Sequence, residues 1–182
     1  ERGTGRPLLL VHGFPLDHQM WKGQIAELSE AFRVMAPDLR GFGRSDDSTS
    51  LVTMSQLADD LAELLEKRAA GQPAVFCGLS MGGYIAWQFW RRHPERLSHL
   101  ILCDTRSAPD SPAAAQARLE TAERVLAEGT ATLVDTMIPQ LFSERTRRQN
   151  REVVAATQHV MRTARPAGVA AALRGMAQRE DA

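Results

Sequence analysis

Short apolar runs bounded by glycine or proline alternate with segments of helical spacing over the first hundred residues. The runs are Leu8 to His12, Val34 to Asp38, Ala74 to Leu79 and Leu100 to Asp104. Runs that are apolar along their length are typical of parallel strands covered on both faces. The pattern therefore predicts an α/β fold in which a parallel sheet carries helices on both faces.

Three helices are predicted between these strands. Apolar residues three and four positions apart indicate amphipathic helices over about 21–28 and 57–65. The second is preceded by Thr53 and Gln56, which have the spacing of a capping box. The third helix runs from about Met81 to His93 and stops at the proline that follows.

The amino-acid composition changes after Asp104, where strand-like apolar runs are absent and alanine, arginine and glutamate dominate. We expect residues 1–108 to form the α/β unit and residues 109–182 to form several helices that lie upon it as a lid or side layer. The expected boundaries are a helix start at Ser111-Pro112, a stop at Gly129, a break at Pro139 and a boundary at Arg165-Pro166.

Size and charge limit the classes of function. With 182 residues and 43% hydrophobic content, the chain can bury one sizeable core but not two. Its 22 Lys+Arg balance 22 Asp+Glu, which argues against a nucleic-acid binder or a polybasic membrane binder and favours a small or neutral partner. The basic cluster of Arg145, Arg147, Arg148 and Arg151 lacks interleaved aromatics, so we interpret it as a solvated face.

Cysteine content and hydropathy bear on the compartment. Two cysteines, Cys77 and Cys103, are too few for a disulfide framework or a zinc site, and inert packing is their expected role. No signal-peptide pattern is present, so we expect a cytoplasmic protein. The charge-free stretch from Ala69 to Trp90 has the length of a membrane span, but its glycines and proline favour a strand, a turn and a helix in a core.

The strongest chemical signal is Gly78-Leu79-Ser80-Met81-Gly82, a G-x-S-x-G motif between a predicted strand and a predicted helix. A sharp strand-to-helix turn crowds the backbone, and Gly78 and Gly82 supply the room. Ser80 is then exposed at the turn as a candidate nucleophile. The backbone N–H of Met81 opens the helix and points to where charge would develop on a substrate carbonyl oxygen.

A second candidate donor follows the first strand, in His12-Gly13-Phe14-Pro15. Proline has no N–H, so the available main-chain donor is that of Phe14. Together Phe14 and Met81 would complete an oxyanion hole. His12 could act as an acid or base, but a histidine beside a tight loop at a strand end is more often a hydrogen-bonded structural group, which is the interpretation we favour.

These motifs resemble the capped serine hydrolases of the α/β-hydrolase fold family. The matching blocks are His12 to Phe14, Asp38 to Ser45 (DLRGFGRS) and Gly78 to Gly82, in the family's order and spacing. The resemblance covers about residues 5–108, the hydrolase core portion, and the helices after it look like the family's cap. It implies that Ser80 is the nucleophile and that Asp38 with Arg40 holds a turn together. No metal or cofactor is implied.

The serine narrows the choice within the family. Haloalkane dehalogenases and epoxide hydrolases carry aspartate at the position of Ser80, so those branches are disfavoured. Acyl transfer through a serine ester remains. Apolar rows on the cap, Leu133-Met137-Leu141 and Val134-Ile138-Phe142, are expected to pack on the core and are candidates for lining an acyl pocket.

The rest of the catalytic triad does not follow from this chain. The family's order is Ser, then Asp or Glu, then His, with the last two after later strands. Asp104 matches a position that some members use for the acid, but a loop cap ahead of the next segment is the interpretation that we favour. The histidines that follow Ser80 are His93, His99 and His159, and none occupies the family position. We therefore expect the missing residues in a C-terminal segment outside this chain, and pairing with that segment or self-association of the chain.

Three hypotheses follow. The first is a serine hydrolase that cleaves a carboxylic ester, lactone or thioester through an acyl-enzyme on Ser80. The second is a non-catalytic hydrolase-fold protein that binds a ligand or partner under the cap. The third is an inactive portion of a larger hydrolase. Whether an Asp and a His reach Ser80 discriminates between them.

Overall fold

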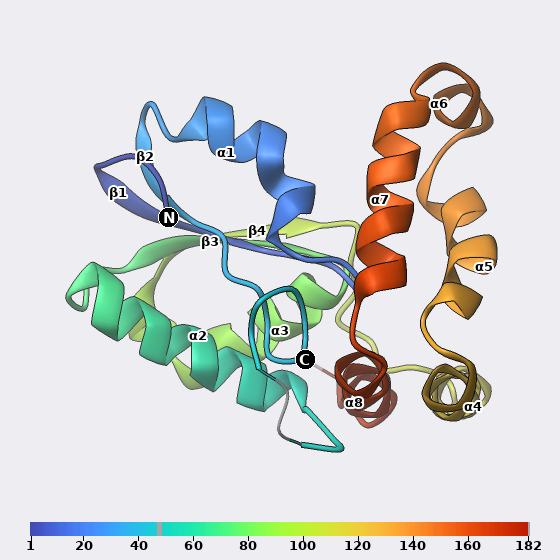
Figure 1. The fold of residues 1–182 in the computed structure, drawn as a ribbon. Helices are drawn as coiled ribbons and strands as arrows, with labels where there is room; N and C mark the ends of the chain where they lie inside the picture. Colours follow the sequence, from blue (N-terminus) through green and yellow to red (C-terminus); the bar gives the residue numbers. More distant parts are fainter. Residues whose placement is uncertain (47–48, 182) are drawn as a thin grey trace.

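A computed structural model describes residues 1–46 and 49–181 (Figure 1). The strands are β1 (Arg6–Val11), β2 (Phe32–Met35), β3 (Ala74–Leu79) and β4 (Leu97–Cys103). The helices of the first part are η1 (His18–Trp21), α1 (Lys22–Leu28), α2 (Met54–Ala69), α3 (Met81–Arg92) and η2 (Pro94–Arg96). Those of the second part are α4 (Pro112–Glu128), α5 (Ala131–Leu141), α6 (Glu144–Gln149), α7 (Arg151–Thr163) and α8 (Pro166–Ala177).

The four strands form one parallel sheet in the order β2-β1-β3-β4. Side chains alternate across it, because successive residues of a strand point to opposite faces. Leu8 and Leu10 pack with Trp21 on the face covered by α1, whereas Leu9 and Val11 join the larger core cluster under α2 and α3. The predicted fold class, a parallel sheet with helices on both faces, is confirmed.

Several helix boundaries lie where capping residues, glycine or proline in the sequence predicted them. The side chain of Thr53 accepts a hydrogen bond from the Gln56 N–H and the Gln56 side chain accepts one from the Thr53 N–H, as expected of a capping box. Ser111 caps α4 and Gly129 ends it, as predicted. The α8 helix begins at Pro166.

Several predicted boundaries are wrong, including the start of β4, which is Leu97 and not Leu100. Pro139 does not break its helix, because α5 continues through it to Leu141. The proline stands in the last turn, where one lost hydrogen bond is tolerated more easily than in the middle of a helix. The second strand runs from Phe32 to Met35 and not from 34 to 38, and residues 36–38 continue as a loop after it.

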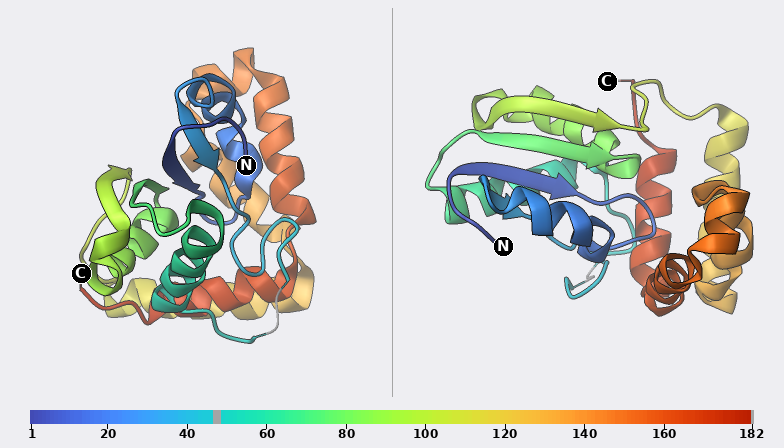
Figure 2. Two further views of the ribbon diagram at one scale, coloured as in Figure 1. Left: turned by 90° about the vertical axis from the view of Figure 1, so that its left-hand side faces the viewer. Right: turned by 90° about the horizontal axis from the view of Figure 1, so that it is seen from above.

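The helices after β4 share a core with the sheet. Figure 2 shows the strands pointing toward this helical layer, so their carboxyl ends face it. Helix α8 buries eight of its 12 residues, and the six that are not glycine belong to the same cluster as Leu9 and Val11. A Cβ added to Gly168 would lie 2.0 Å from the Gly41 carbonyl oxygen, so α8 meets the first part of the chain backbone to backbone. Position 108 thus marks a change of secondary structure within a continuous core.

Strand β4 lies at one edge of the described sheet and is covered less than predicted. Its residues are intermediate or exposed along its length, and Ile101 retains 45% of its accessible surface. Trp90 on the neighbouring helix α3 retains 51%. An edge strand carries unpaired backbone groups that favour pairing with further strands. Among residues 1–46 and 49–181, no helix is both long and apolar enough to cross a membrane.

Candidate active site

The strand order places two loops at one crevice. The chain passes from β1 to β2 on one side, and then crosses so that β3 lies on the other side of β1. Loops that follow strands at such a reversal diverge, and ligands of open α/β sheets bind in the crevice between them. The segment after β1 begins with His12 and the segment after β3 begins with Ser80, so topology brings the two predicted motifs together.

Ser80 occupies a strained turn between β3 and α3. Its backbone angles are φ 50° and ψ −107°, a region that non-glycine residues rarely adopt. The backbone on both sides holds the strain, because the Ser80 N–H donates to the Cys103 carbonyl at 2.9 Å and the Ser80 carbonyl accepts from the Gly83 N–H at 2.9 Å. The side chain makes no capping hydrogen bond to α3. Its hydroxyl is therefore not engaged in capping the helix that it begins.

The glycines of the motif are required by close approach. A Cβ on Gly78 would lie 2.3 Å from the Gly82 carbonyl oxygen, and a Cβ on Gly82 would lie 2.4 Å from the Val11 carbonyl oxygen. Real Cβ atoms essentially never come so close to a backbone oxygen. The sequence-based expectation that Gly78 and Gly82 supply room at the turn agrees with this geometry.

Of the two predicted oxyanion donors, Met81 follows Ser80 directly in the chain, and Phe14 follows Gly13 in the loop that approaches the Ser80 turn. Met81 opens α3, and the first N–H groups of a helix have no partner within it. A Cβ built on Gly13 would lie 3.6 Å from the Ser80 Cβ, so the β1 loop passes directly over the turn. Phe14 follows Gly13, and its ring contacts Phe42 edge to face at 6.3 Å. The two N–H groups come from different loops that the β1–β3 reversal brings together.

Asp104, the candidate triad acid, is exposed at the end of β4 with a positive φ of 40°. Both of its neighbours contact the turn: the Cys103 carbonyl accepts the Ser80 N–H, and the Thr105 hydroxyl donates to the Ser80 carbonyl at 2.9 Å. The structure therefore brings the backbone of Asp104 next to Ser80.

The three histidines after Ser80 lie elsewhere. His93 ends α3, whose 12 residues span about 18 Å from the Ser80 end, and its Nε2 is 2.7 Å from Asp59 Oδ1. His99 pairs with Val75 near the start of β3, at the opposite end of the strand from Ser80. His159 is exposed on α7. Each agrees with the expectation of a surface or packing residue.

His12 is fully buried and hydrogen-bonded through both ring nitrogens. Nε2 accepts from the Leu39 N–H at 3.0 Å, and Nδ1 donates to the Gly13 carbonyl at 3.1 Å. The partners thus require the neutral Nδ1–H tautomer. Burial lowers the pKa of His12 from 6.5 to about 4, against the opposing effect of the hydrogen bond to Gly13. Its role is to join the loops after β1 and β2, as the structural interpretation expected.

This burial predicts a pH dependence of stability. Because the pKa of His12 is about 4 in the folded chain and 6.5 ordinarily, the unfolded state binds the proton first. Stability from this group is complete above pH 6.5 and is lost as the pH falls toward 4, by about 3 kcal/mol. Urea unfolding across this window should show the loss, and His12→Gln should flatten the slope. A variant at exposed His159, His159→Gln, is the matched control, and an unchanged slope in His12→Gln would contradict the assignment.

The loop after β2 is organised by Asp38, whose side chain is 5% exposed. It accepts hydrogen bonds from the His18 N–H at 2.9 Å, from His18 Nδ1 at 2.6 Å and from the Arg44 N–H at 3.0 Å. Burial alone would raise the pKa of Asp38, but these donors outweigh it and the pKa is lowered. Asp38 therefore holds a turn, as the resemblance implied.

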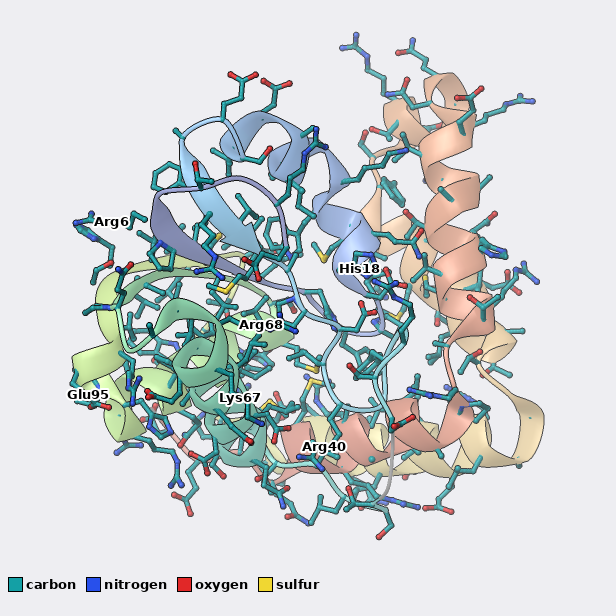
Figure 3. All side chains as sticks on the ribbon, turned by 60° about the vertical axis from the view of Figure 1, so that its left-hand side comes forward. Arg6, His18, Arg40, Lys67, Arg68 and Glu95 are labelled. Atoms are coloured by element: carbon teal, nitrogen blue, oxygen red, sulfur yellow. The ribbon has the colours of Figure 1, made fainter. Side chains whose placement is uncertain are left out.

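The predicted partner of Asp38 in this turn is corrected. Arg40, which Figure 3 labels, does not pair with Asp38. Its guanidinium forms a bidentate ion pair with Asp60 of α2, at 2.9 and 2.5 Å. The Asp38 carboxylate instead accepts its hydrogen bonds from His18 and from the backbone of Arg44. Arg40 thus anchors the loop to α2, a long-range pairing that no local pattern indicates.

Sequence reasoning missed the side chain of His18, which Figure 3 labels. It lines a cavity of about 280 Å³ whose other lining residues include Asp38, Val160 and Thr163, so the cavity lies between η1, the loop after β2 and the carboxyl end of α7. Ligand-type atoms of Asp17, His18 and Asp38 lie within 4.8 Å of one another. A divalent ion would have to displace the His18–Asp38 hydrogen bond, so these residues fit an ion poorly. Ser80 is not among the residues that line this cavity.

Comparison with known proteins identifies the family. Residues 6–171 match the alpha/beta hydrolase fold family. A thermophilic esterase from Thermogutta terrifontis, solved with malate bound, is 50% identical and has a TM-score of 0.97 over 99% of this chain and 66% of its own. An enol-lactonase from Burkholderia xenovorans is 29% identical, with a TM-score of 0.89 over 98% of this chain and 67% of its own. Among curated proteins, Epoxide hydrolase 3 of Xenopus tropicalis is 39% identical over 97 residues, 52% of this chain and 26% of that protein.

The chain belongs to the alpha/beta hydrolase fold family. It spans about two thirds of the two solved hydrolases and a quarter of the curated epoxide hydrolase. The fold, the order of the motifs and the relatives all agree with membership of this family.

Proposed function

We propose that this protein is a serine hydrolase that cleaves a carboxylic ester, lactone or thioester through an acyl-enzyme on Ser80. The observation that carries the proposal is the turn at Ser80, with φ 50° and a side chain that does not cap its helix. Strain of this kind costs on the order of 1–3 kcal/mol and persists where the surrounding structure over-determines it, typically at functional sites.

The proposed mechanism assigns one role to each group. Ser80 Oγ attacks the substrate carbonyl carbon, and the alcohol or thiol leaves to give a serine ester that water then hydrolyses. The backbone N–H groups of Phe14 and Met81 stabilise the negative charge that develops on the carbonyl oxygen. Asp104 is our candidate for the triad acid, since its backbone neighbours hold the Ser80 turn.

A base must complete the site. A serine hydroxyl is a weak nucleophile at neutral pH without a hydrogen-bonded imidazole. His93, His99 and His159 lie away from Ser80, and the similar solved hydrolases are about half as long again as this chain. We therefore propose that the histidine belongs to polypeptide outside residues 1–182, which would pair with the edge of the sheet at β4.

The relatives support a carboxylic ester or lactone as substrate. The two solved neighbours are described as an esterase and an enol-lactonase. Some curated relatives are epoxide hydrolases, but Ser80 favours acyl transfer over the aspartate chemistry expected of that branch. A small-molecule ester, with no nucleic acid or membrane partner and a reducing cytoplasm as the compartment, fits the neutral charge and the two free cysteines.

Covalent labelling tests the nucleophile. A fluorophosphonate probe should label the tryptic peptide that contains Ser80, because this turn combines an unengaged hydroxyl with two oxyanion donors. Ser80→Ala should abolish the label, whereas Ser29→Ala, at a partly exposed serine whose hydroxyl donates to the Ala26 carbonyl, should retain it. Mass spectrometry of the labelled peptides decides the result. Label that persists in Ser80→Ala would exclude the assignment and favour a ligand-binding protein.

A further inference from the structure

Two thiols lie side by side next to the Ser80 turn. The Sγ atoms of Cys77 and Cys103 are 3.8 Å apart, and both cysteines are free. They come from neighbouring parallel strands, in which Cys77 pairs with Ile101 and Leu79 pairs with Cys103. The cysteines are therefore diagonal neighbours on one face of the sheet. The proposed hydrolysis uses neither of them.

The two cysteines lie close to the proposed nucleophile, Cys77 in the same strand and Cys103 in the neighbouring strand. Cys77 lies three residues before Ser80 in β3 and is followed by Gly78, which has no room for a side chain. The backbone carbonyl of Cys103 accepts the Ser80 N–H at 2.9 Å. Any movement of these two strand ends therefore acts on the backbone that holds the strained turn.

We propose that Cys77 and Cys103 are a modification site, at which a low-molecular-weight disulfide such as oxidised glutathione forms a Cys77–Cys103 disulfide that lowers the reactivity of Ser80. The lowered reactivity of Ser80 rests on the proposed function, whereas formation of the disulfide does not. A disulfide bond is about 2.05 Å long, so the sulfurs must approach by about 1.8 Å from their present separation. Drawing the strand ends together shifts the Cys103 carbonyl, which anchors Ser80.

The chemistry starts at the more accessible sulfur. Cys103 is partly exposed, whereas Cys77 is buried, and burial together with Cys103 raises the pKa of Cys77 to about 12. The Cys103 thiolate attacks one sulfur of the small disulfide, breaks its S–S bond and releases one thiol, which takes up the Cys103 proton. The Cys77 sulfur then attacks Cys103 Sγ and gives its proton to the second departing thiol. The two cysteines are oxidised and the small disulfide is reduced to two thiols.

Peptide mapping tests the disulfide on the intact polypeptide. After treatment with oxidised glutathione, non-reducing digestion should yield a linked peptide of Cys77 and Cys103 that is two hydrogens lighter than the sum of the two. Cys77→Ser should stop at a glutathione adduct on Cys103, and Cys103→Ser should take up no glutathione. A wild-type protein that gives no linked peptide would overturn the proposal.

The effect on Ser80 is measured with the fluorophosphonate probe. Oxidised protein should label about tenfold more slowly than reduced protein, since small displacements of a reacting group have large effects on rate. Dithiothreitol should restore the rate, and the double variant Cys77→Ser, Cys103→Ser should not respond to oxidised glutathione. A linked peptide with an unchanged labelling rate would refute the control of Ser80. Reduced protein that takes no label would instead refute the hydrolase function, while the linked peptide would still decide the disulfide.

Discussion

A chimera that joins residues 1–182 to the parts of the Thermogutta terrifontis esterase outside the matched region should hydrolyse p-nitrophenyl acetate at least about a thousandfold faster than residues 1–182 alone. The matched region covers 66% of that esterase at 50% identity and a TM-score of 0.97, so the joined parts should dock on the same sheet. The gain follows because removal of the triad base costs several powers of ten and leaves only the oxyanion hole and binding.

The comparison has an internal control. Ser80→Ala in the chimera should return turnover to the level of residues 1–182, because the proposal assigns the nucleophile to Ser80 and expects only the base from the added parts. Equal, Ser80-dependent turnover by both forms would instead place the base within residues 1–182, and His159 and His93 would be the next residues to test. Initial rates with purified proteins decide between these outcomes.

Asp110→Asn should destabilise the fold by about 3–5 kcal/mol, the expected cost of removing one partner from a buried ion pair. The Asp110 side chain is 1% exposed and accepts from Arg118 at 2.5 Å, Arg179 at 2.8 Å and Arg106 at 2.7 Å. Burial by itself would raise the pKa of Asp110, but the hydrogen bonds from Arg118 and Arg179 outweigh it and lower the pKa to about 2.

The cluster of Asp110 with Arg106, Arg118 and Arg179 connects the helical layer to α3. Asp110 lies before α4, Arg118 lies in α4, and Arg179 follows α8. Arg179 is 4% exposed, and its guanidinium stacks on Tyr84 of α3 at 3.9 Å. Loss of the Asp110 charge leaves this buried cation without its carboxylate and loosens the two segments by which the helical layer is attached to α3.

Urea unfolding measures the effect, with Glu144→Gln as the matched control. Glu144 pairs with Arg148 on α6, where both side chains are well exposed, so this substitution should cost no more than about 1 kcal/mol. Because the pKa of Asp110 is lowered, its contribution is present above the ordinary value of 3.8 and is lost as the pH falls toward 2. A loss in Asp110→Asn no larger than in Glu144→Gln would show that the cluster does not hold the layers together.

Local patterns in the sequence were sufficient to predict most of the helices and strands and the turn at Ser80. Apolar runs predicted the four strands to within a few residues, and the capping box at Thr53 predicted the start of α2. The G-x-S-x-G motif predicted the strained turn at Ser80, because the requirement for glycine at positions 78 and 82 is a property of neighbouring backbone. Pro139 was misjudged since its effect depends on its distance from the helix end, which the sequence does not mark.

Long-range partners were decided only by the tertiary structure. The pairing of Arg40 with Asp60, the burial of His12 between two loops, the Asp110 cluster and the contact of Cys77 with Cys103 join residues distant in sequence. Hydrophobic period and turn chemistry are local, whereas the partner of a polar side chain depends on which loops the strand order brings together. The sequence by itself thus determined the sheet, its helices and the Ser80 turn, and the tertiary structure decided which groups surround that turn, because only the β2-β1-β3-β4 order places them beside it.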